Sequence, residues 1–156
     1  MKLSHELIDT FYSAFQKKDS ETMKGCYLSE ATFNDEVFKN LNGYQAGKMW
    51  EMLLKNGKDM QMVYEITDDN VAFPKAKWTA TYTFSKTGRK VVNVIYAEFV
   101  IKDGKILTHT DSFDFHRWAK QAFGPMGILL GWTGFFKTKI QKTVSQTLEN
   151  YITKHP

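Results

Sequence analysis

Between residues 60 and 115 the sequence alternates apolar and polar side chains in four segments, and glycine turns join the last three. The segments are Met60–Thr67, Lys75–Lys86, Val91–Ile101 and Lys105–Phe115. Such alternation is typical of a strand with one buried face. Thr87-Gly88 and Asp103-Gly104 suit the tight turns of β-hairpins. Strands joined by consecutive hairpins pair antiparallel, so the sequence predicts a continuous antiparallel sheet.

The residues that precede this sheet are mostly helical in their spacing, with apolar side chains three and four positions apart. Helices are predicted over Leu3–Phe15, from Asp19 or Ser20 through Tyr27, and over Tyr44–Lys55, with a short strand over Ala31–Phe38. Ser4 is expected to cap the first helix, and Gly57 to end the third. Helices followed by an antiparallel sheet predict an α+β fold with the helices on one face of the sheet.

The sequence changes character after the last strand. Residues 123–136 are apolar but rich in glycine, which excludes an ordinary membrane-crossing helix, and we interpret them as a lid over a pocket mouth. Thr138–Thr153 is amphipathic and predicts a final helix that covers the sheet, a pocket mouth or a second subunit. A chain of 156 residues is the size of one domain. We therefore expect a single domain over residues 1–156, with a core at 4–116 and a C-terminal helical extension at 118–155.

Charge and cysteine content exclude several kinds of partner. The net charge is +4 and the basic residues are scattered, so no nucleic-acid partner is expected. The densest basic group follows the apolar stretch, and a solvated helix face is favoured over phosphate or lipid contact; it comprises Lys120, Lys137, Lys139 and Lys142. Cys26 is the only cysteine, so no disulfide forms within the chain. Without an apolar signal or spanning segment, no membrane partner and a cytoplasmic location are expected.

Metal and cofactor motifs are absent from the sequence. The four histidines lie far apart and match no metal-binding spacing, so no metal site is expected. Gly124-Pro125-Met126-Gly127 does not follow a strand of a βαβ unit, and no Gly-x-Ser-x-Gly motif occurs. The sequence therefore predicts a protein that works without a cofactor.

Three groups of residues, taken in order, resemble the nuclear transport factor 2-like superfamily over roughly residues 4–116. They are Leu7–Phe15 with Lys18-Asp19, Ala31–Asp35 with Gly43, and the hairpin residues Gly88–Val92, Glu98-Phe99 and Asp103–Ile106. That superfamily includes ketosteroid isomerases, limonene epoxide hydrolase and SnoaL-like polyketide cyclases. The tail, from Asp111–Trp118 through Gly124 and at Gly131-Trp132, is similar to a SnoaL-like subgroup.

The resemblance implies a cone-shaped fold in which helices and a strongly curved sheet enclose a mostly apolar pocket. It places Asp35 where the isomerases hold their general-base aspartate. It places Phe11 and Ala97 where they hold the two hydrogen-bond donors of an oxyanion hole. Neither side chain here is a donor, so a dienolate could not be stabilised in that way and steroid isomerase activity is not expected.

His109 and Asp111 are the strongest candidates for chemistry. They are two residues apart on one strand, so both side chains point to the same face. A carboxylate beside an imidazole orients the ring for proton transfer. SnoaL-like cyclases use an aspartate from this late strand, which Asp111 resembles. We hypothesise that Asp111 and His109 share acid–base work with Asp35. The alternative for the pair is a buried polar network or a contact at a dimer interface, and the alternative for Asp35 is a polar strand end that faces water.

The resemblance also implies which faces are turned inward, and from it a further set of side chains is expected to contact a ligand. The set comprises Tyr12, Trp50, Trp78, Tyr82, Asn93 and Phe113. Aromatic residues make up 15% of the chain, which suits either a pocket with flat walls or a thick core. Plain core packing is therefore the alternative for the rings, and satisfaction of buried backbone groups is the alternative for Asn93.

The leading functional hypothesis is binding of a small, mostly apolar organic molecule in an internal pocket. Proton chemistry of the isomerase, cyclase or hydratase kind is its stronger form. The alternative is a homodimeric, non-catalytic protein–protein interaction module whose core is filled by side chains. A homodimer is expected from analogy with the superfamily under both hypotheses.

Overall fold

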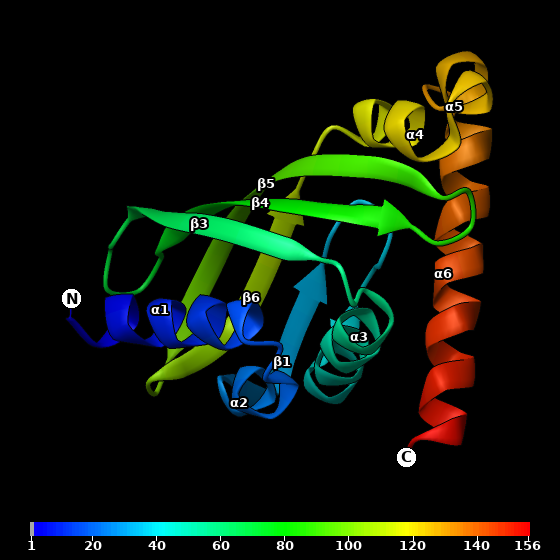
Figure 1. The fold of residues 1–156 in the computed structure, drawn as a ribbon. Helices are drawn as coiled ribbons and strands as arrows, with labels where there is room; N and C mark the ends of the chain where they lie inside the picture. The colour runs from blue at the N-terminus through cyan, green and yellow to red at the C-terminus, as the bar shows by residue number, and fades with distance from the viewer. Residues whose placement is uncertain (1) are drawn as a thin grey trace.

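A computed structural model describes residues 2–156 as a six-stranded sheet with helices packed against it (Figure 1). The sheet order is β2-β1-β6-β5-β4-β3. The strands are β1 (Tyr27–Asn34), β2 (Leu41–Asn42), β3 (Gln61–Asp68), β4 (Lys75–Phe84), β5 (Arg89–Lys102) and β6 (Lys105–Ser112). The helices are α1 (Lys2–Gln16), α2 (Ser20–Gly25), α3 (Gly43–Asn56), α4 (Phe115–Phe123), α5 (Pro125–Leu130) and α6 (Gly134–Lys154). The predicted α+β fold is confirmed.

The predicted hairpins form the long central part of the sheet. β3, β4, β5 and β6 pair antiparallel in sequence order. Gly88 and Gly104 have φ values of 73° at the two tight turns, a conformation that glycine adopts without strain. β1 departs from the prediction of a purely antiparallel sheet, because it pairs parallel with β6. This pairing places Phe33 beside His109.

The first strand begins earlier than predicted. The second helix begins at Ser20, as expected, but ends at Gly25 rather than Tyr27, and the strand expected over Ala31–Phe38 is β1, which ends at Asn34. The carboxyl group of Asp35 accepts hydrogen bonds from backbone N–H groups two and three residues later, which turns the chain and ends the strand. The shift moves Tyr27 from a helix end into the sheet.

The helix boundaries largely follow the prediction. α3 begins at a capping box formed by Asn42 and Gln45, and Gly57 caps its end as expected. Ser4 is not a cap, because α1 already begins at Lys2. Ser4 is itself a residue of the helix, and its hydroxyl donates a hydrogen bond to the carbonyl of Asn70 at 3.2 Å.

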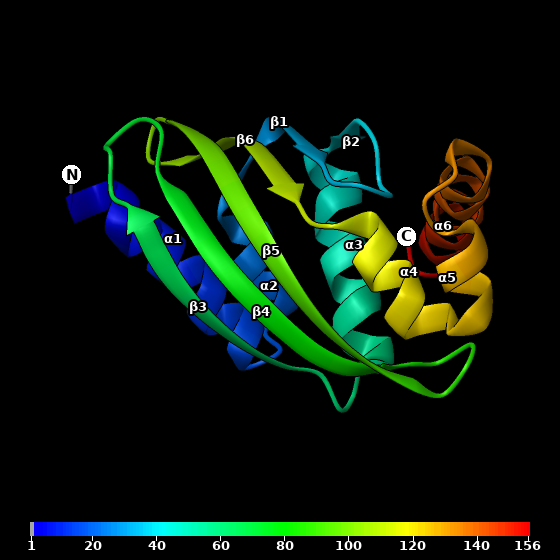
Figure 2. The ribbon, with the colours of Figure 1, turned by 90° about the horizontal axis from the view of Figure 1, so that it is seen from above.

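The helices α1 and α3 lie on the concave face of the twisted sheet, as Figure 2 shows for α1 beneath β3 and β4. Large rings fill the space between them, including Phe11, Tyr12 and Trp50. A second, smaller cluster lies around α4 and the start of α6, where Phe115, Trp118 and Phe136 are buried. The C-terminal extension thus has an apolar cluster of its own at the end of the central hairpin.

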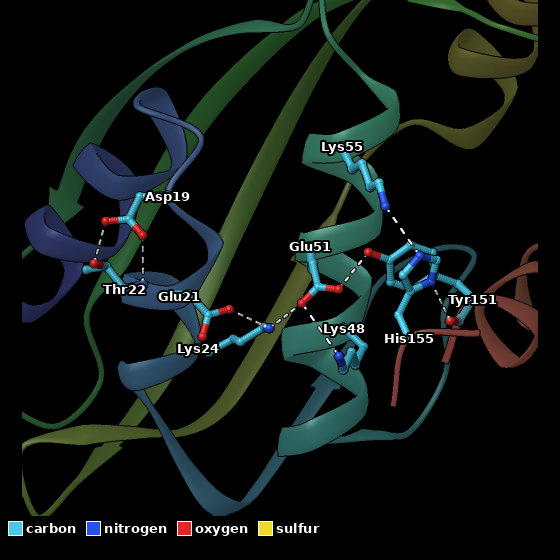
Figure 3. Close-up of polar contacts among 9 residues, drawn as sticks. All are labelled: Asp19, Glu21, Thr22, Lys24, Lys48, Glu51, Lys55, Tyr151 and His155. Atoms are coloured by element: carbon cyan, nitrogen blue, oxygen red, sulfur yellow. Dashed lines mark hydrogen bonds and ion pairs between the residues drawn. The ribbon is translucent and has the colours of Figure 1, made fainter. Parts of the chain in front are cut away.

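The long helix α6 runs beside α3, as the amphipathic pattern of its sequence allows. Leu148 is buried in the main core, and the Tyr151 hydroxyl donates a hydrogen bond to Glu51 at 2.6 Å (Figure 3). Partial burial opposes ionisation of Glu51, but the hydrogen bonds from Lys24 and Tyr151 and the charges of Lys24 and Lys48 lower its pKa to about 2. Glu51 therefore stays ionised and holds α2, α3 and α6 together.

The glycine-rich segment does not form the predicted lid. A Cβ atom on Gly127 would lie 1.9 Å from the carbonyl oxygen of Ala119, so α5 packs backbone to backbone on α4. A Cβ atom on Gly131 would likewise lie 2.7 Å from the Ala119 side chain. From residues 123–136, only Phe123 lines the cavity described below. These two glycines serve close helix packing rather than hinge motion.

We predict that Gly127→Ala destabilises the fold by about 1–3 kcal/mol, because the added methyl group must push two backbones apart. Gly134→Ala is the matched control, since no atom lies within 4 Å of a Cβ atom there. Chemical denaturation of both variants measures the difference. Equal stability of the two variants would contradict the close packing of α5 on α4.

Candidate functional site

A cavity of about 300 Å³ lies between the concave face of the sheet, α3, α4 and α6. Its wall is mostly apolar with a few polar groups, as is typical of sites for small molecules. The predicted site residues on this wall are Asp35, Trp50, Trp78, Tyr82, Asn93, Asp111 and Phe113. They come from α3, from β4 to β6 and from the segments that follow β1 and β6. The topology therefore gathers residues that lie far apart in the sequence.

Two predicted site residues lie behind this wall instead of on it. His109 is fully buried among rings, with the centroids of Phe99 and Phe33 at 4.3 and 4.9 Å from its own. Tyr12 is also fully buried, stacked on Tyr64. The structure thus places Tyr12 in the core, where it does not contact the cavity, and leaves His109 to act only through a neighbour.

A chain of buried hydrogen bonds runs from α3 to the cavity. Trp50 Nε1 donates to the Tyr27 hydroxyl at 2.9 Å, and that hydroxyl lies 2.8 Å from His109 Nδ1. On the other side of the ring, His109 Nε2 lies 2.8 Å from Asp111 Oδ1. Asp111 is 3% exposed, and it lines the cavity. The chain therefore ends at a carboxyl group that a ligand can reach.

Trp50 and Tyr27 together fix the direction of the chain. An indole nitrogen can only donate, so the Tyr27 oxygen accepts from Trp50, and among the described residues the acceptor within reach of its own hydrogen is His109 Nδ1. Burial is the main cause that raises the pKa of Tyr27 well above its usual value, so the hydroxyl keeps this hydrogen. An imidazole that accepts at Nδ1 carries its hydrogen on Nε2 and donates to Asp111. One oxygen of the carboxyl group is thereby held in place.

Asp35 supplies a second carboxyl group with different surroundings. Its Oδ1 accepts hydrogen bonds from the backbone N–H groups of Val37 at 2.8 Å and Phe38 at 2.6 Å. Burial raises the pKa of Asp35 to about 7, against the effect of these two donors, and the negative charge of Asp111 adds to the rise. Asp35 therefore exchanges a proton near neutral pH, which suits a general acid or base.

The strand faces assigned from the sequence agree with the structure. Asn93, Ile95, Ala97 and Phe99 are buried on one face of β5. In the register of the sheet, Ala97 lies opposite Asp111 and Phe99 opposite His109. Alternation groups these residues on one face of their strands, and the resemblance to the superfamily indicated that this face is turned inward.

Sequence reasoning missed two contributors to the site. Tyr27, the link between Trp50 and His109, was expected at a helix end, because the start of β1 depends on its pairing with β6. The other is the wall that α6 supplies through Ile140, Thr143, Val144 and Thr147. The amphipathic pattern of that helix was visible, with a pocket mouth among the surfaces it could cover. The spacing of the apolar residues in α6 did not indicate which of these surfaces the helix would cover.

The site holds no cluster of metal-binding side chains. Within residues 2–156, no group of three or more histidine, cysteine, aspartate or glutamate side chains could hold a metal ion. The arrangement instead offers two carboxyl groups, one of them oriented by a histidine, on the wall of an apolar cavity. Such an arrangement can move protons on a bound organic molecule.

Comparison with known proteins identifies the family. The sequence profile of the SnoaL-like domain matches residues 8–109, about two thirds of the chain. The chain belongs to the SnoaL-like family. The matched region ends two residues before Asp111 and does not include α4, α5 or α6. No curated protein sequence matches this SnoaL-like chain significantly.

Solved structures agree on the fold. An LEH-like epoxide hydrolase from M. tuberculosis has a TM-score of 0.63 at 15% identity, covering 83% of this chain and 96% of its own. A proposed polyketide cyclase from Xanthomonas campestris has a TM-score of 0.65 at 16% identity, covering 78% and 97%. A nuclear transport factor 2-like protein from Burkholderia pseudomallei, of unknown function, has a TM-score of 0.68 at 12% identity, covering 80% and 100%. The SnoaL-like chain thus has the nuclear transport factor 2-like fold, and each of these three structures leaves part of the chain unmatched.

We predict that Asp35 makes stability depend on pH. The raised pKa means that Asp35 binds its proton more tightly in the folded protein than in the unfolded chain. The stability that this proton contributes to the folded state is therefore lost as the pH rises from about 4 through 7. Asp35→Asn keeps the oxygen that accepts from Val37 and Phe38 but cannot ionise. Its stability relative to wild type should rise by about 2–4 kcal/mol between pH 4 and pH 8. Urea denaturation at both pH values tests this, and a constant difference would contradict it.

We predict that His109 carries its hydrogen on Nε2 in the free protein. Long-range ¹⁵N–¹H correlation spectra distinguish the two neutral forms of the ring. Tyr27→Phe should lose about 1–3 kcal/mol of stability, because Trp50 Nε1 and His109 Nδ1 lose their partner, whereas the hydrogen stays on Nε2, where Asp111 still accepts it. Tyr96→Phe is the control, since the Tyr96 ring is exposed. A hydrogen on Nδ1 in the wild-type protein would refute the direction of the chain.

Proposed function

We propose that the protein binds a small, mostly apolar organic molecule in this cavity and catalyses proton transfer of the cyclase or isomerase kind. Asp111 accepts a proton from a carbon beside a carbonyl group, and Asp35 donates a proton to the oxygen or carbon where charge develops. The observation that carries the proposal is that both carboxyl groups line one apolar cavity in different surroundings. Carboxyl groups whose environments differ are suited to opposite roles as acid and base.

The hydrogen-bond chain supports the role of Asp111 as the base. His109 holds one of its oxygens through Nε2, which leaves the other oxygen to approach the ligand. The ring itself is enclosed by Phe11, Phe33 and Phe99, so it cannot rotate freely to another partner. His109 is therefore a positioning residue, and Tyr27 fixes its orientation in turn.

Protonated Asp35 supports the other half of the reaction. An enolate needs a hydrogen-bond donor at its oxygen, and neither Phe11 nor Ala97 can supply one. With a pKa of about 7, Asp35 still holds a proton on a large fraction of molecules at neutral pH. It can donate a hydrogen bond to the developing oxyanion, as a neutral carboxylic acid does in other enzymes with apolar sites.

The family gives the reaction class further support. Among the neighbours of similar fold are IdmH, a proposed polyketide cyclase from Streptomyces antibioticus, and the LEH-like epoxide hydrolase. Both names describe enzymes that act on organic molecules. The cavity also favours ligand binding over the alternative of an interaction module with a filled core, because a filled core would leave no such space. The homodimer remains a prediction under this proposal.

A cavity-filling variant tests the binding half. The protein is incubated with a small-molecule extract and retained compounds are identified by native mass spectrometry. Ala80→Leu fills the cavity, since Ala80 is buried on its wall. Thr81→Leu is the matched control, because the neighbouring residue faces the opposite side of β4. We expect wild type and the control to retain a compound that Ala80→Leu loses. Retention by all three, or by none, would contradict binding in this cavity.

We predict that the captured compound exchanges a carbon-bound hydrogen for deuterium in D₂O when the wild-type protein is present. Asp111→Asn should retain the compound but slow the exchange by about 10²-fold or more, the typical contribution of a general base. Mass spectrometry of the compound over time measures the rate. Exchange at the wild-type rate in Asp111→Asn would contradict the assigned base while leaving the binding result intact.

A further inference from the structure

Large apolar side chains are exposed together on α5 and the first turn of α6, at the end of α6 far from the C-terminus (Figure 1). We call residues 126–135 the apolar tip. Its exposed members are Met126, Ile128, Leu129, Leu130, Trp132 and Phe135. Leu129 and Trp132 are each 70% exposed, and Phe135 is 78% exposed. Exposed apolar patches of this kind mark surfaces that contact another molecule or a membrane.

The apolar tip is held in position by the packing beneath it. Gly127 and Gly131 bring α5 against α4, and Phe136 is buried in the small cluster at the base of the tip. Its polar side-chain atoms are used internally, because Trp132 Nε1 donates to the Leu129 carbonyl at 3.0 Å and Thr133 Oγ1 donates to the Leu130 carbonyl at 2.7 Å. What the tip presents to the outside is therefore almost purely apolar.

The surroundings of the apolar tip are strongly basic. Residues 115–148 contain five of the 21 basic residues and none of the 17 acidic ones, so the rest of the chain has a net charge of −1. The five are Arg117, Lys120, Lys137, Lys139 and Lys142. Lys137 is paired with Glu36 at 2.6 Å, and the others are exposed. On α6, Phe135 lies four and seven residues before Lys139 and Lys142, which places all three on one helix face.

We propose that the apolar tip inserts into the interfacial region of an anionic lipid surface, with the exposed lysine and arginine side chains at the headgroup phosphates. Apolar and aromatic side chains backed by basic residues are typical of proteins that lie on a membrane. Trp and Phe suit the boundary between headgroups and acyl chains. The proposal concerns surface contact, since no helix within residues 2–156 has the length and hydropathy needed to cross a bilayer. It replaces the expectation of no membrane contact.

Two features favour lipid over a protein occupant. A second copy of the chain docked about a two-fold axis would bring like charges together around the tip, because four exposed basic side chains lie in residues 115–148 and Glu36, which contacts this region, is already paired with Lys137. A protein partner also forms about one hydrogen bond per 100–200 Å² of interface, whereas the polar side chains of the tip are already satisfied. Lipid acyl chains need no hydrogen bonds.

Vesicle binding tests the proposal without any knowledge of the cavity ligand. Purified protein is sedimented with phosphatidylcholine vesicles and with vesicles that also contain phosphatidylserine. We expect binding to the anionic vesicles, weakened by added salt. A blue shift of tryptophan emission should accompany it, because Trp132 is exposed whereas Trp50, Trp78 and Trp118 are buried. Because this spectral change is measured on the wild-type protein, it reports insertion even if a variant fails to fold.

Two double variants separate the apolar and the ionic contributions. Trp132→Ser with Phe135→Ser, and Lys139→Glu with Lys142→Glu, should each weaken binding by about tenfold or more. Val63→Ser is the control, since Val63 is 67% exposed on β3. Binding that is absent from both vesicle types, or unchanged in the double variants, would overturn the proposal. Two further results would also overturn it. One is binding to poly-glutamate but not to vesicles that depends on the tip residues, and the other is a wild-type oligomer that becomes a monomer in the variant with Trp132→Ser and Phe135→Ser.

Discussion

A buried chain of hydrogen bonds runs from α3 through β1 and β6 to the cavity and gives the site its geometry. Its members lie in a dense aromatic core, where an unpaired polar group costs about 1–3 kcal/mol. Each member therefore depends on the next. Trp50 can only donate, and the Tyr27 hydroxyl hydrogen has His109 Nδ1 as its acceptor, so Asp111 receives a hydrogen bond from His109 Nε2 on one oxygen. The parallel pairing of β1 with β6 makes this chain possible, since it brings Tyr27 within reach of His109.

The C-terminal extension adds two properties to the family fold. The profile match ends at residue 109, yet α4 and α6 supply part of the cavity wall through Trp118, Ile140 and Val144. Trp118 also donates a hydrogen bond to the Tyr82 hydroxyl at 2.8 Å, which joins the extension to the sheet. The same helices carry the apolar tip at their outer end. In the proposed arrangement, an apolar ligand would leave a lipid surface close to the helices that line its binding site.

The sequence predicted the parts of this structure that depend on neighbouring residues. Gly88 and Gly104 mark the hairpins, alternation puts His109 and Asp111 on one strand face, and the resemblance to the superfamily identified that face and the face of Asn93 as the concave ones. Boundaries set by distant contacts were not predictable in the same way. β1 was placed too late because its register depends on β6 and its end on the turn at Asp35.

The chemical properties of the site also come from distant contacts. Asp35 could have been a solvated strand end on sequence grounds, and only burial in the cavity wall raises its pKa to about 7. Tyr12 had the right residue type and the right helix for a ligand contact, but its ring points into the core. Residue type and spacing therefore predicted the candidates, while their roles required the packing of α3 and α6 around them.

The central claim is that Asp35 holds a proton in the cavity near neutral pH under the influence of Asp111. Carboxyl ¹³C NMR of selectively labelled protein measures this directly, as the titration midpoint of Asp35 in the wild-type protein and in Asp111→Asn. The account predicts a wild-type midpoint of about 7 that falls in the variant, because a negative charge has been removed. A midpoint near the ordinary value of about 4 in the wild-type protein would contradict it.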